Sequence, residues 1–154
     1  MSSHAASPTL YIIYNATSTV FGKVNYVYRK LTCPDPDSKP ACAACELTHG
    51  PSLRLTESPQ WVETKNRILN AKVVQIHQDE MPRSLSAWMK GEAVATPALV
   101  VSEPHENADT FKLLLTKTDL AQVRHDHEEF LQLLQKRATE EGVTNMIIES
   151  NPSN

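Results

Sequence analysis

The segment VATPALVVSEPHENADTFKLLLT, residues 94–116, contains two apolar runs joined by a polar link. The runs Ala98–Val101 and Phe111–Thr116 are rich in residues that are typical of strands. Because the link between them is short, we expect the two strands to pair with each other in antiparallel orientation. Thr96-Pro97 directly precedes the first strand. This segment therefore predicts one half of a β-sheet.

Two further strands are predicted nearer the N-terminus, the apolar run Leu10–Tyr14 and the segment Lys72–His77, and they form the other half of the sheet. Helical periodicity, caps and proline positions predict helices between and after the strands. These helices are expected over Val20–Leu31, over Pro59–Leu69 with Ser58 as N-cap, over Leu85–Lys90, and from Thr118 and Asp119 onwards. Since helices connect the early strands, we expect those strands to be parallel.

This order of elements resembles the thioredoxin fold. The resemblance is carried by KVVQIHQDEMP, residues 72–82, which is similar to that family's second strand and exit turn, and by VATPALVV, residues 94–101. It implies an α/β domain in which a mixed four-stranded sheet is flanked by helices. It also implies a cis bond before Pro97, beside the family's redox site. We expect one domain over residues 9–148, with an insert at 32–70 between the first helix and the second strand. Disordered tails are expected at 1–8 and 149–154.

The composition restricts the classes of function. With 154 residues and a net charge of −3 the chain fits one soluble domain, and its Lys and Arg residues are dispersed. Neither a basic surface for nucleic acid nor a membrane span of roughly 20 apolar residues is indicated. The N-terminus lacks the pattern of a secretory signal. Three cysteines, an odd and low number, favour reduced thiols in the cytoplasm over a secreted disulfide scaffold.

All three cysteines lie in one segment, CPDPDSKPACAACELTHG, residues 33–50. Cys33, Cys42, Cys45 and His49 have the spacing C-x8-C-x2-C-x3-H, and three prolines make the segment a loop. Thiolate and imidazole are ligands that zinc and copper(I) prefer. A C-x-x-C pair can also perform thiol–disulfide exchange, or be packed as inert small residues.

The chain departs from the usual thioredoxin-like redox site. That family places C-x-x-C at the start of its first helix, and the matching positions here are Ser18 and Phe21. The chain is also similar to small bacterial and fungal proteins that share three motifs. The matching residues here are Tyr14-Asn15-Ala16, the stretch from Cys42 to Gly50, and His77-Gln78-Asp79-Glu80. This second resemblance implies no particular activity.

His77 ends a predicted strand and is followed by Asp79 and Glu80. Ligands gather beyond the carboxyl ends of strands in open α/β sheets, so these residues are candidates for the site, although a hydrogen-bonded core histidine is the more common role of a single His on a strand. Asp79 or Glu80 could move protons if the site is catalytic. His127 falls on an apolar stripe, where a half-buried core role is expected.

We therefore predict a metal site for zinc or copper, built on Cys42 and Cys45. His77, His49 and Cys33 compete for the remaining positions, and a small molecule or a thiol is the expected substrate if the site is catalytic. The first alternative is a thiol–disulfide oxidoreductase that uses Cys42 and Cys45 near Pro97. The second is a non-catalytic interaction module that lacks the first-helix cysteines.

Overall fold

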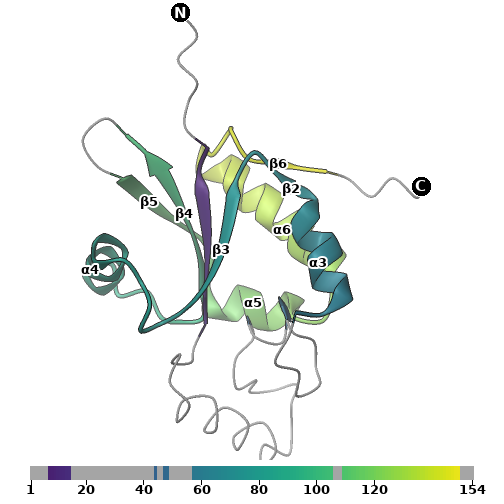
Figure 1. The fold of residues 1–154 in the computed structure, drawn as a ribbon, viewed down its shortest axis with the longest axis horizontal. Coiled ribbons are helices and arrows are strands. Elements are labelled where there is room, and N and C mark those ends of the chain that lie inside the picture. The colour runs from purple at the N-terminus through teal and green to yellow at the C-terminus, as the bar shows by residue number, and fades with distance from the viewer. Residues whose placement is uncertain (1–6, 15–43, 45–46, 49–56, 106–108, 150–154) are drawn as a thin grey trace, which may run out of the picture.

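The computed structural model describes residues 7–14, 44, 47–48, 57–105 and 109–149 (Figure 1). The predicted helix over Val20–Leu31 and most of the insert lie outside these residues. The elements are β1 (Thr9–Tyr14), α3 (Pro59–Asn66), β2 (Ile68–Leu69), β3 (Lys72–His77), α4 (Arg83–Gly91), β4 (Ala98–Pro104), β5 (Asp109–Leu115), α5 (Lys117–Val123), α6 (His127–Glu140) and β6 (Ile147–Ile148).

The central sheet has the strand order β3-β1-β4-β5. β1 is parallel to β3, whereas β4 is antiparallel to both of its neighbours, β1 and β5. The prediction of an α/β fold with a mixed four-stranded sheet is therefore confirmed. The β1–β3 register pairs Tyr14 with His77, so both strands end at the same edge of the sheet. The Thr96-Pro97 peptide bond at the start of β4 is cis.

Helices cover the two faces of the sheet unequally (Figure 1). α4 lies on one face, over a small core that contains Ile13, Leu85 and Val100. α3, α5 and α6 lie on the other face, over the larger core. β1 serves both cores because alternate side chains point to opposite faces: Leu10, Ile12 and Tyr14 enter the larger core, and Ile13 enters the smaller one.

The helix predicted over Pro59–Leu69 is shorter in the structure. Its N-terminus is as expected, because the Ser58 side chain accepts a hydrogen bond from the backbone N–H of Trp61. The helix ends at Asn66, however, and Ile68–Leu69 instead form β2, which pairs with β6. Asn70 has a φ of 60°, and this left-handed residue lies between β2 and β3.

The predicted final helix is divided into two. Thr116 caps α5 in a capping box with Asp119, two residues before the predicted start. A second cap then begins α6, because the Asp126 side chain accepts a hydrogen bond from the backbone N–H of Glu129 at 3.0 Å. Aspartate at this position competes with continuation of the preceding helix and favours a new one.

The innermost residues of both predicted tails, Pro8 and Glu149, are hydrogen-bonded to the domain. The Pro8 carbonyl accepts from the Lys72 N–H at 3.0 Å, and the Glu149 N–H donates to the Arg67 carbonyl at 2.8 Å. The tail residues 1–6 and 150–154 lie outside the described part of the chain. Among the described helices, none has the length and apolar character that a membrane span requires.

Candidate functional site

His77 and Glu80 form a pair at the carboxyl edge of the sheet. The backbone N–H of His77 donates to Glu80 Oε1 at 3.0 Å, and the same carboxylate oxygen pairs with His77 Nδ1. The hydrogen bond from the His77 backbone, followed by that from its ring, lowers the pKa of Glu80, which is therefore an anion at neutral pH. Since Nδ1 is engaged, Nε2 is the ring nitrogen of His77 that is available to a further ligand.

The Tyr14 side chain connects this edge to the segment that contains the cysteines in sequence. Its ring packs edge-on against the His77 ring, with 5.3 Å between centroids. Its hydroxyl lies 3.0 Å from Thr48 Oγ1, and Thr48 Oγ1 donates to the Ala44 carbonyl at 3.0 Å. Ala44, Leu47 and Thr48 are all fully buried, and the two apolar residues belong to the larger core. Residues on both sides of Cys45 in sequence are thus attached to the end of β1.

These contacts continue into a hydrogen-bonded chain across the sheet. Gln75 Nε2 donates to the Tyr14 hydroxyl at 2.8 Å, and Gln75 Oε1 accepts from Trp61 Nε1 at 3.2 Å and from Lys65 Nζ at 3.3 Å. Because the Thr48 proton points to Ala44, the Tyr14 hydroxyl donates to Thr48 and accepts from Gln75. We call the chain Trp61–Gln75–Tyr14–Thr48–Ala44 the polar relay.

Burial keeps the relay in one protonation state. Tyr14 is 4% exposed, and desolvation raises the pKa of its phenol, although its hydrogen bonds with Gln75 and Thr48 oppose the shift. The phenol therefore stays neutral and remains a donor at physiological pH. Sequence analysis missed this relay. The one signal in the sequence is Gln75, an amide between the apolar residues Val74 and Ile76.

His127 lies apart from this edge, at the start of α6. Thr64 Oγ1 donates to the Gln60 carbonyl at 2.8 Å, so it accepts a hydrogen bond from His127 Nδ1 at 2.7 Å. The imidazole also packs near Trp61, with ring centroids 6.2 Å apart. Burial lowers the pKa of His127, and Asp126 partly offsets that effect. The predicted half-buried structural role of His127 is confirmed.

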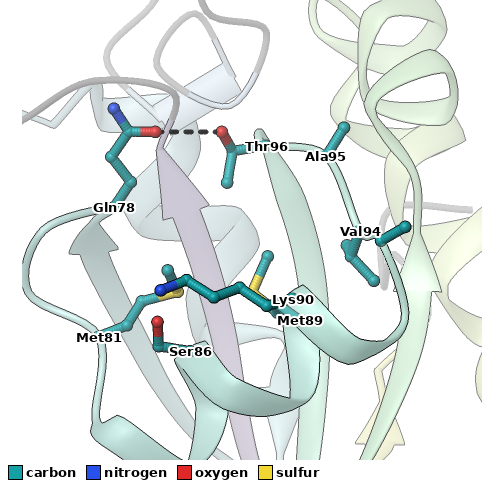
Figure 2. Close-up of a pocket in the computed structure, with 9 residues that line it drawn as sticks. Gln78, Met81, Ser86, Met89, Lys90, Val94, Ala95 and Thr96 are labelled. Atoms are coloured by element: carbon teal, nitrogen blue, oxygen red, sulfur yellow. Dashed lines mark hydrogen bonds between the residues drawn. The ribbon is translucent and has the colours of Figure 1, made fainter.

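A pocket of about 630 Å³ lies on the α4 side of the sheet (Figure 2). It runs from the exit of β3 to the loop that precedes β4. The Thr96 hydroxyl donates to Gln78 Oε1 at 3.3 Å and so connects these two loops. The residues that line the pocket are Gln78, Met81, Ser86, Met89, Lys90, Ala93, Val94, Ala95 and Thr96. The sequence analysis identified none of them as site residues.

The predicted ligands are only partly within the described residues. His77 lies at the sheet edge with 29% of its side chain exposed, and Asp79 and Glu80 are exposed in the turn that follows. Cys33, Cys42, Cys45 and His49 lie outside the described residues. Within the described part of the chain, no three His, Cys, Asp or Glu side chains are grouped so that they could hold a metal ion.

Comparison of the chain with protein-family models, curated proteins and solved structures finds no match.

Proposed function

We propose that this protein binds a zinc or copper(I) ion through Cys42, Cys45 and His77, on a thioredoxin-like domain. Cys33 and His49 are the candidates for a fourth ligand. The metal lies at the carboxyl edge of β1 and β3. A small molecule or a thiol is the substrate if a coordination position stays open.

The observation that carries the proposal is the attachment of Ala44 and Thr48 to Tyr14. Thr48 Oγ1 lies 3.0 Å from both the Ala44 carbonyl and the Tyr14 hydroxyl, and Tyr14 packs against His77. Cys45 follows Ala44 directly in the sequence, and consecutive Cα atoms are about 3.8 Å apart. The relay therefore supports a site in which the C-x-x-C pair and His77 belong to the same edge of the sheet.

The pairing of His77 with Glu80 supports the role of His77 as a ligand. Histidines that bind metals usually donate the other ring N–H to a carboxylate, which fixes the ring and makes the ligating nitrogen more basic. Glu80 is suited to this task because its carboxylate is ionised and is also held by the His77 backbone. In this proposal Glu80 orients His77, and Asp79 is the candidate for proton transfer.

The donor set fits soft or borderline metals. Two thiolates and one imidazole satisfy copper(I) at low coordination number, whereas zinc requires a fourth ligand or a water molecule. When bound, such an ion would act as a Lewis acid or as a structural link between the insert and the sheet. The thioredoxin-like assignment is supported by the strand order, because two parallel strands are followed by an antiparallel hairpin at one edge.

Metal content after purification under reducing conditions tests the proposal. We expect one equivalent of zinc or copper in the wild type and none in the Cys42→Ser/Cys45→Ser double variant. His77→Ala should lower the affinity measured by chelator competition, and Glu80→Gln should lower it by about 10- to 100-fold. His105→Ala, which changes an exposed loop histidine, is the matched control and should bind metal as the wild type does.

Two results would refute the proposal. One is a metal-free wild type that fails to bind added Zn²⁺ or Cu(I) and contains a reducible Cys42–Cys45 disulfide. That result supports the thiol oxidoreductase instead. The other is equal metal affinity in the wild type and His77→Ala, which removes His77 from the site.

A further inference from the structure

The pocket beside α4 combines a cation with an apolar floor. Ser86 and Lys90 are four residues apart on α4 and therefore lie on the same face of that helix. Figure 2 shows the Lys90 side chain extended across the pocket, with the Ser86 hydroxyl on the same side. Among the described residues, no ion pair engages Lys90, and no acidic side chain lines the pocket. The described lining therefore carries a net positive charge, from Lys90.

The rest of the lining is aliphatic and sulfur-containing. Met89 is buried in the smaller core, and Met81 and Val94 are half-buried against the same core. The flexible thioethers of methionine adapt to ligands of varied shape. None of the described residues that line the pocket is aromatic, so they offer no stacking surface for a nucleobase or another flat ring. These features favour an aliphatic ligand body.

We propose that this pocket binds a small aliphatic carboxylate. The carboxylate lies at Lys90 and Ser86, which together offer an ammonium and a hydroxyl donor. The hydrocarbon part lies against Met81, Met89 and Val94. The volume of about 630 Å³ is within the range of pockets that hold small organic ligands. This inference is independent of the metal site, because it uses none of the proposed ligands.

Titration with hexanoate, followed by NMR of the full-length protein, tests this proposal. We expect saturable shifts at the backbone amides of Ser86, Lys90 and Val94. Hexanamide, which has the same chain and no charge, should bind about five- to tenfold more weakly, as expected for the loss of one charge-assisted contact. Lys90→Met keeps the aliphatic stem and should weaken hexanoate binding by a similar factor.

Lys136→Met is the matched control, because Lys136 is an exposed lysine of α6 that does not line the pocket. It should bind hexanoate as the wild type does. Equal affinity for hexanoate and hexanamide would overturn the proposal. So would equal weakening by the Lys90 and Lys136 substitutions, or shifts that do not saturate.

Discussion

α4 and α6 end in the same backbone motif but with different residues at the left-handed position. In α4 the Val94 N–H donates to the Met89 carbonyl at 2.9 Å, and Ala93 between them has a φ of 54°. In α6 the Val143 N–H donates to the Ala138 carbonyl at 2.8 Å, and Gly142 has a φ of 74°. This is the Schellman motif, which favours glycine at the residue that Ala93 and Gly142 occupy. We therefore predict that Ala93→Gly stabilises the protein.

The magnitude follows from two opposing effects. The left-handed conformation lowers the folding stability by about 1–2 kcal/mol when the residue has a side chain, and glycine removes that strain. Glycine also gives the unfolded chain more freedom, which costs about 0.4–1 kcal/mol. Ala93 is exposed, so loss of its methyl group sacrifices little buried surface. The net gain is roughly 1 kcal/mol, or a rise in Tm of about 2–4 °C for a domain of this size.

Urea unfolding of three variants measures this effect. Gly142→Ala should destabilise by roughly 1 kcal/mol for backbone reasons alone, because a Cβ at that position would meet no atom within 4 Å. Ala95→Gly changes an exposed alanine of the same loop that lacks a positive φ, and it should destabilise slightly. If Ala93→Gly lowers the unfolding midpoint as Ala95→Gly does, the argument from left-handed strain is refuted.

Three further predictions concern the relay, His127 and the start of α6. Tyr14→Phe leaves the half-buried amide of Gln75 without its acceptor and should cost about 1 kcal/mol in urea unfolding; if the metal proposal is correct, it should also weaken metal binding. Because the folded pKa of His127 is lowered, its contribution to stability is present above the unfolded value of 6.5 and is lost as the pH falls below that value towards the folded pKa. Unfolding at pH 7.5 and 5.5 should therefore show a larger decrease in the wild type than in His127→Gln, and equal decreases would contradict this. Asp126→Ala removes the cap of α6 and should cost about 1 kcal/mol, whereas Asp126→Asn should cost little.

The central sheet could be predicted because its strands are apolar runs that the pattern of side chains marks directly. Ala98–Val101, for example, is fully buried, and a strand buried on both faces is a continuous hydrophobic run in the sequence. β4 and β5 extend further than predicted, to Pro104 and from Asp109. The predicted strands were too short because Ser102 and Glu103 at the end of β4, and Asp109 and Thr110 at the start of β5, are polar. Hydrophobicity does not mark such ends.

The relay and the pocket could not be predicted from the sequence, since both depend on register. Thr48, Tyr14 and Gln75 come from three segments, and only the parallel pairing of β1 with β3 brings the last two together. Likewise, Gln78 follows β3 and Thr96 precedes β4, and the two residues meet because these strand ends lie at the same edge of the sheet. β2 and β6 were missed for another reason: two-residue strands are too short to have a period.

The pairing of β2 with β6 has a consequence for the order of events during synthesis. Ile68 and Leu69 leave the ribosome long before Ile147 and Ile148, which are their only strand partners within the described residues. The contacts of Arg67 also form late in synthesis, because its guanidinium donates to the Glu128 carboxylate and to the Glu149 carbonyl. β1 and β3 can therefore pair in the nascent chain before β2, which lies between α3 and β3, has its partner β6. Until β6 emerges, Ile68 and Leu69 are apolar residues of an unpaired strand, which a chaperone could recognise.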